Sequence, residues 1–287
     1  MKRSTARIAI RLISVLVVGL GCLAPRALSQ MAVAGGQQAT PQSNGVDSLA
    51  TQLHMLTDVQ KQPPGVDKRE FADYKAFYTE NSEPAKKIQL GKAFLQKYPQ
   101  STLTEAVDAE LVDAYVDRQD LPDAYSSADA ALALKPDDVD VLTTVGWVIP
   151  HFYQADDPGA DALLTKAETY EQHALQLMAT MPKPAGVSDA QFAALKTQKT
   201  LQAHSALGLV YFRREDYDNS EKELRQAVES AHPDPADLFV LGVDLQNLKR
   251  PGEATNIFNR CAAMQSELQG RCKDSAAESQ KISSQQK

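Results

Sequence analysis

The sequence contains little glycine, few cysteines and none of the common catalytic motifs. Only 14 of its 287 residues are glycine, which favours helices over strands because glycine destabilises a helix interior. Its five histidines are scattered and form no HExxH pair, and no GxSxG elbow, Walker loop or GxGxxG segment occurs. The sequence therefore predicts an all-α protein that is not an enzyme and that uses no cofactor or metal.

A surplus of basic residues, which nucleic-acid binding would need, is also missing. Five basic and no acidic residues lie in residues 1–29, which leaves 25 basic and 37 acidic residues, a formal charge of −12, for the rest of the chain. Phosphate groups are bound by Lys and Arg surfaces. The acidic body of the chain argues against nucleic acid or an anionic membrane surface as its partner.

Residues 1–29 have the pattern of a secretory signal peptide. A basic segment, residues 1–11, precedes an apolar run, residues 12–24, which is shorter than the ~20 residues of a membrane span. Ala27 and Ser29 then place small residues at the −3 and −1 positions of a cleavage site. We expect cleavage after Ser29 and export to the periplasm or beyond the cell.

Two alternatives to this interpretation remain at the N-terminus. Ala32-Val33-Ala34 is a second candidate cleavage site, further from the apolar run. The second alternative is that the protein is a lipoprotein whose lipid is attached to Cys22, although Leu20 lies one position later than a good lipobox requires. Association with a membrane is expected only if the signal segment is retained or lipidated.

Two of the three cysteines, Cys261 and Cys272, would remain after export. An even number of cysteines in an oxidising compartment favours a disulfide, and their spacing of 11 fits a bridge from the end of one helix to the next helix. Two free, half-buried cysteines are the alternative. Neither cysteine has a second ligand at CxxC spacing, which argues against a metal site.

The remainder of the chain divides into a polar segment and a helical region. Residues 30–66 are rich in Gln, Gly, Ser, Thr and Pro, and we expect a flexible linker. From residue 67 onward, apolar residues recur at three- and four-residue spacings, which predicts amphipathic helices. Pro150 should end one helix early, and Ser188 with Gln191 predicts a capping box that opens a long helix over residues 189–213.

The helical region repeats itself every 34 residues. Gly208 and Gly242 are 34 residues apart, as are Ala227 and Cys261. A fixed period of this size indicates a solenoid, in which each unit buries its apolar face against its neighbours. Gly146 precedes Gly208 by 62 residues, so the third unit carries about 28 inserted residues.

The repeated unit resembles that of the tetratricopeptide repeat (TPR) family. That unit has bulky residues at positions 4, 7 and 11, Gly or Ala at 8, Ala at 20 and 27, and Pro at 32. The clearest matches lie in two units, with Leu111, Val112, Tyr115, Ala124, Ala131 and Pro136 in one, and Leu238, Leu241, Gly242, Leu245, Ala254 and Phe258 in the other. The resemblance implies about five repeats, near residues 68–101, 102–138, 139–200 with the insertion, 201–234 and 235–268, then a capping helix (268–281) and a disordered tail (282–287).

The resemblance also implies a function and a site. TPR units form a right-handed superhelix of antiparallel helix pairs, whose concave face holds a peptide or a partner's helix and is lined by positions 2, 5, 9, 12 and 13 of each first helix. Carried over by register, the candidate groove residues are Trp147, His151, Phe212, Arg213, Phe239 and Gln246. The three aromatic candidates are Trp147, Phe212 and Phe239, because aromatic residues are common interface anchors. The alternative role of each is packing against the inserted segments.

Two acidic residues at the same register positions, Asp113 and Asp117, would favour a basic partner, or are simply solvated. We therefore expect a non-enzymatic scaffold or adaptor of the bacterial cell envelope that binds a protein or peptide. A lipid-anchored assembly factor is the alternative.

Overall fold

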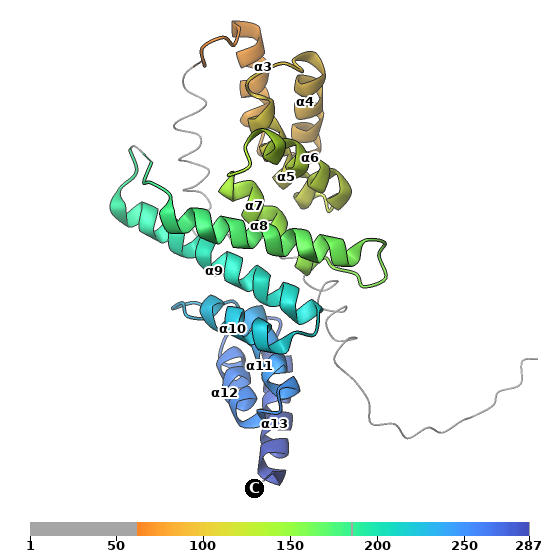
Figure 1. The fold of residues 1–287 in the computed structure, drawn as a ribbon, viewed down its shortest axis with the longest axis vertical. Helices are drawn as coiled ribbons and strands as arrows, with labels where there is room; N and C mark the ends of the chain where they lie inside the picture. Colours follow the sequence, from red (N-terminus) through yellow and green to blue (C-terminus); the bar gives the residue numbers. More distant parts are fainter. Residues whose placement is uncertain (1–61, 185, 287) are drawn as a thin grey trace, which may run out of the picture. The chain divides into compact units, whose positions relative to one another are not determined.

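The computed structural model describes residues 62–184 and 186–286. The predicted signal peptide, Cys22 and nearly all of the predicted linker lie outside these residues. Within them the regular structure is entirely helical (Figure 1), as predicted. The helices are α3 (Lys68–Tyr78), α4 (Pro84–Lys97), α5 (Thr104–Asp117), α6 (Leu121–Leu134), α7 (Val139–His151), α8 (Ala160–Thr180), α9 (Asp189–Arg213), α10 (Tyr217–Ala227), α11 (Pro235–Asn247), α12 (Pro251–Ala262) and α13 (Gln269–Gln285).

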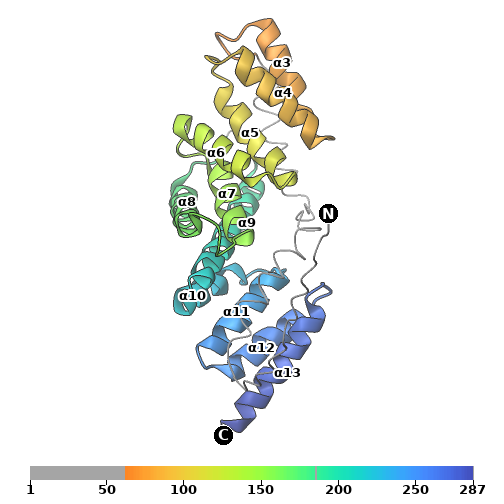
Figure 2. The ribbon, with the colours of Figure 1, turned by 90° about the vertical axis from the view of Figure 1, so that its right-hand side faces the viewer.

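The first ten of these helices form five successive antiparallel pairs, from α3–α4 to α11–α12, followed by α13 (Figure 2). We call them the first to the fifth pair. The first helix of each pair also packs against both helices of the preceding pair, as α11 does against α9 and α10. The chain folds as a helical solenoid of the TPR type.

The buried clusters extend from one pair to the next. One buried cluster takes residues from α3, α4, α5 and α6, and the next takes residues from α5 through α9. Apolar surface left open by one pair is therefore covered by its neighbour, which is the stabilising principle of a solenoid. Val66, the last residue of the predicted flexible linker, is buried in the first cluster, so ordered packing begins before residue 67.

Glycines at the eighth repeat position let the two helices of a pair come close together. A Cβ atom added to Gly146, Gly208 or Gly242 would lie 2.7 Å or less from a side chain of the second helix, namely Glu171, Leu224 and Phe258. These distances are well below ordinary van der Waals contact. Each of these glycines therefore marks a point where the two helices of a pair cross in close contact, and the crossing recurs from pair to pair.

Three of the turns inside the pairs are the same motif. Gln119, Glu215 and Lys249 each adopt a left-handed conformation, with φ between 58° and 61°. The residue after each of them donates its backbone N–H to a carbonyl five residues back, as Arg250 does to Leu245 at 2.8 Å. This is a Schellman-type end, which glycine usually provides. Because none of the three positions holds a glycine, the sequence alone does not predict this turn.

The third pair departs from the repeat. Pro150 lies inside the last turn of α7, so the prediction that it ends the helix was wrong: the helix continues to His151 before the loop at 152–159. The inserted residues mainly lengthen α8 and α9, which lie side by side in Figure 1. The predicted capping box is confirmed, because Ser188 and Gln191 bond each other's backbone at the start of α9.

The polar helix α13 closes the array. A disulfide joins Cys272 to Cys261 of α12, with Cα atoms 5.8 Å apart and both side chains fully buried. The helix continues to Gln285, so the prediction of a disordered tail from residue 282 was wrong over most of its length. No proline or glycine follows Gly270 to break the helix.

Candidate functional site

The six predicted groove residues come from α7, α9 and α11, but the structure brings only three of them together. Trp147 and His151 of α7 stack on each other, the charge of Arg213 of α9 acts on His151, and all three side chains are half-buried. Phe212, Phe239 and Gln246 are engaged elsewhere. We call Trp147, His151, Tyr153 and Arg213 the α7–α9 cluster.

The two rings of α7 stack on each other. The ring centroids of Trp147 and His151 are 3.8 Å apart, with 27° between the ring planes, as their four-residue spacing on one helix face allows. His151 Nδ1 lies 2.6 Å from the carbonyl oxygen of Trp147. Because a carbonyl oxygen only accepts, Nδ1 is the donor, which leaves Nε2 as an acceptor in the neutral ring.

Burial keeps this imidazole neutral. Desolvation lowers the pKa of His151 to about 4, the bond to Trp147 partly opposes that shift, and the charge of Arg213 adds to it. At neutral pH the stacked pair therefore presents an indole and an uncharged imidazole.

Arg213 ties α9 to the end of α7. Its Nε donates to the carbonyl oxygen of Pro150 at 3.1 Å, which satisfies one of the carbonyls left open at the helix C-terminus. Its guanidinium carbon lies 5.7 Å from the ring centroid of Tyr153. No described residue bonds its two terminal nitrogens, so four donor hydrogens remain for a ligand or water.

The other three predicted residues serve the packing of the protein itself. Phe212 is 7% exposed and contacts Tyr217, and Phe239 is 5% exposed. Arg271 of α13 lies 4.8 Å from the ring centroid of Phe239, and Gln246 Nε2 donates to Ser279 Oγ at 2.7 Å. The capping helix thus covers the groove positions of α11, which the repeat register alone does not reveal.

The groove positions of the second pair carry two exposed carboxylates, Asp113 and Asp117. Both side chains are open to solvent, which keeps their ionised forms hydrated, and the acidic residues Glu110 and Asp140 act on Asp113 as neighbours. Those two neighbours are already paired, Glu110 with Lys87 at 2.5 Å and Asp140 with Lys199 at 3.0 Å. The face around Asp113 and Asp117 therefore retains acidic character.

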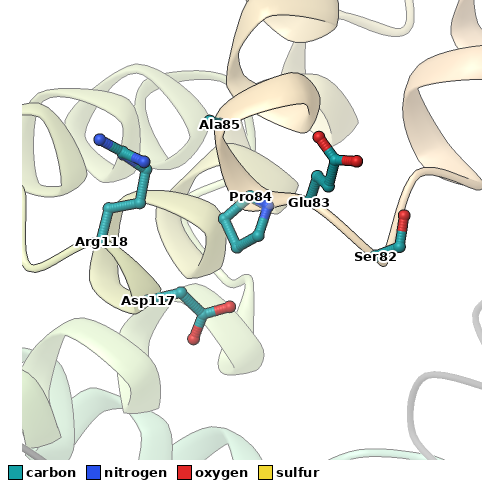
Figure 3. Close-up of a pocket in the computed structure, with 6 residues that line it drawn as sticks. All are labelled: Ser82, Glu83, Pro84, Ala85, Asp117 and Arg118. Atoms are coloured by element: carbon teal, nitrogen blue, oxygen red, sulfur yellow. The ribbon is translucent and has the colours of Figure 1, made fainter.

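An open hollow lies beside Asp117, between the start of α4 and the end of α5 (Figure 3). It is lined by Ser82, Glu83, Pro84, Ala85, Asp117 and Arg118. Figure 3 shows the Asp117 carboxylate and the Arg118 guanidinium pointing in different directions, so the lining groups do not converge on one point.

Within residues 62–184 and 186–286, no three His, Cys, Asp or Glu side chains gather as metal ligands would. In the same part of the chain, every helix is too short or too polar to cross a membrane.

Comparison with known proteins gives a likeness in structure alone. No family model and no curated protein matches the chain. Among solved structures, it is similar to a thermophilic TPR protein of Thermus thermophilus, with 16% identity, a TM-score of 0.46, and coverage of 67% of this chain and 90% of that one. The solenoid fold is instead established by the antiparallel helix pairs, the close helix contacts at Gly146, Gly208 and Gly242, and the recurring turns.

Proposed function

We propose that the protein is a non-enzymatic scaffold of the bacterial cell envelope that holds a peptide or a helix of a partner protein against the first helices of its pairs. The observation that carries this proposal is the α7–α9 cluster. It combines a half-buried indole with a guanidinium whose terminal nitrogens have no partner in the described residues. Trp and Arg are the residue types that most often dominate binding energy at protein interfaces.

The charge of the neighbouring surface supports a partner of defined chemistry. Asp113 and Asp117 lie on α5, whose neighbour α7 carries Trp147. A partner with a Lys or Arg side chain there and a carboxylate near Arg213 would be complementary to both regions.

The sole tryptophan of the chain makes this proposal directly testable. Partners captured by crosslinking in envelope fractions would be identified, purified and titrated while Trp147 emission is recorded. Binding at the cluster should change the emission and saturate. In a titration calorimetry measurement, which needs no tryptophan, Trp147→Ala should weaken binding at least ~30-fold, since such anchors contribute about 2 kcal/mol or more.

A matched control is available on the second helix of another pair. Leu134, at the end of α6, is 61% exposed and occupies no groove position. Leu134→Ala should therefore bind like the wild type. A Trp147→Ala protein that still captures every partner would refute the groove assignment.

Export and anchoring form a separate part of the proposal, supported by residues 1–29. Mass spectrometry of the mature protein distinguishes the two forms. Soluble export predicts an N-terminus at Gln30, whereas the lipid-anchored alternative predicts a modified Cys22. Neither end would be found if the segment is retained.

A further inference from the structure

Two carboxyl groups are buried on the face of α11 that meets the fourth pair. Asp237 is 6% exposed and Asp244 is fully buried. One repeat earlier, the same positions hold Ala203 and Val210, which are also fully buried. The array therefore places ionisable groups where its own pattern calls for apolar side chains, and burying a charged carboxylate is costly.

Each carboxyl meets a serine of the fourth pair. Asp237 Oδ1 lies 2.7 Å from Ser205 Oγ of α9, and Asp244 Oδ2 lies 2.7 Å from Ser220 Oγ of α10. Ser220 is itself fully buried. These two contacts cross the junction between the fourth and fifth pairs, so they bear on how the pairs are held together.

The hydrogen count at Ser220 assigns a proton to Asp244. Ser220 Oγ lies 2.9 Å from the carbonyl oxygen of Gly208 as well as 2.7 Å from the carboxyl. A hydroxyl has one hydrogen, and a carbonyl oxygen only accepts. Both contacts are hydrogen bonds only if Asp244 is protonated and donates to Ser220 while Ser220 donates to Gly208.

Among residues 62–184 and 186–286, no cationic group acts on either carboxyl. Asp244 Oδ1 has no hydrogen-bond partner in the described residues, and the charged groups that act on the pair, Glu221 and Asp234, are both acidic. Desolvation raises the pKa of both carboxyls, that of Asp244 to about 8, and these acids add to the shift.

Four basic residues of the neighbouring helices already have other contacts, and Lys222 of α10 is exposed to solvent. His204 of α9 pairs with Glu223, Arg225 of α10 pairs with Glu221 and Glu253, and Arg250 at the start of α12 pairs with the same two acids. On α13, Arg271 lies over Phe239. The junction is therefore arranged to hold neutral acids.

We propose that the junction between the fourth and fifth pairs is a proton-dependent joint, closed while Asp237 and Asp244 are neutral and loosened when they ionise. Helices α11 to α13 would move as one unit, because the buried disulfide keeps α13 on α12. The inference concerns the fold and does not depend on the proposed function.

The direction of the pH effect follows from proton binding. An exposed Asp in the loosened state ionises near its ordinary pKa of 3.8, whereas Asp244 in the closed state ionises near 8. Between these values the closed state binds more protons. Rising pH therefore favours loosening, by up to about tenfold per pH unit for each carboxyl.

Amide hydrogen exchange of the full mature protein tests the joint. Exchange in α11–α13 relative to α5–α6, corrected for the intrinsic rate at each pH, should rise at least ~10-fold between pH 6 and pH 8 in the wild type. Asn cannot ionise and its amide can donate to a serine. The double variant Asp237→Asn/Asp244→Asn should therefore lose this dependence. Asp218→Asn, at an exposed position of α10, should keep it.

A second measurement decides the matter if the double variant does not fold. Carbon NMR of the wild-type protein should show the carboxyl groups of Asp237 and Asp244 titrating well above pH 6. Wild-type exchange that is equal at pH 6 and pH 8 would overturn the proposal, as would Asp237 and Asp244 carboxyls that are already ionised at pH 6.

Discussion

The glycine crossing in the fifth pair provides a test of how closely these helices must approach. A Cβ atom at Gly242 would lie 2.7 Å or less from three ring carbons of Phe258. Phe258 is fully buried, and its ring centroid is 5.6 Å from that of Phe239, which itself lies under Arg271. The ring therefore has little room to turn away, and we expect α11 and α12 to separate in a Gly242→Ala variant.

The magnitude follows from two opposing terms. Ordinary contact between carbon atoms needs about 3.5–4.0 Å, so about 1 Å of separation is required. Such overpacking costs about 1–3 kcal/mol, and the better helix propensity of Ala returns about 1 kcal/mol. A net destabilisation of up to about 2 kcal/mol is expected, which would lower the melting temperature by up to about 8 °C in a domain of this size.

A double-mutant cycle isolates the contact. In a Phe258→Ala background the ring is gone, so adding Gly242→Ala should no longer destabilise the protein and should instead return the gain in helix propensity of about 1 kcal/mol. In the second pair, Val112 stands at the position of Gly242 and Ala128 at the position of Phe258. There a larger residue on the first helix is accommodated by a smaller residue on the second. Gly270→Ala is the control, because nothing lies within 4 Å of its added Cβ, and it should be neutral or stabilising.

Urea unfolding followed by far-UV circular dichroism would measure the stability of the wild type and of the four variants. A Gly242→Ala variant as stable as Gly270→Ala would refute the reasoning, since both substitutions raise helix propensity and differ only in the space around the new methyl group.

Three further predictions concern single residues. Lys249→Gly should stabilise the protein by about 1 kcal/mol in urea unfolding, because glycine adopts φ 61° without strain. Asp138→Ala should cost about 1 kcal/mol in the same assay, because its carboxylate caps α7 by accepting from Asp140 N and Val141 N. NMR titration of His151 should show a neutral ring above about pH 5. Because its pKa is lowered, its contribution to stability is present above pH 6.5 and lost as the pH falls towards 4.

The repeat period predicted the helices well because it reports on packing between neighbours. Gly146, Gly208 and Gly242 are needed wherever two helices cross closely, so their spacing in the sequence gives the spacing of the pairs. The capping box could be predicted as well, since its two residues, Ser188 and Gln191, lie within one helical turn of each other.

Only part of the candidate site could be predicted from the sequence. Register placed Trp147, His151 and Arg213 on neighbouring helices, and the structure brings them together. The same register also selected Phe239 and Gln246, whose surface α13 covers. Coverage by a helix outside the repeat depends on tertiary docking, so no repeat position could reveal it.

Local pattern alone, through the 34-residue period and the three- and four-residue spacing of apolar side chains, was enough to establish an all-helical solenoid, because both are periodicities of the chain itself. The protonated carboxyls at the junction of the last two pairs are a different matter. Asp237 and Asp244 look like any other helical acids in the sequence. Their burial and their serine partners arise only when α11 docks on α9 and α10.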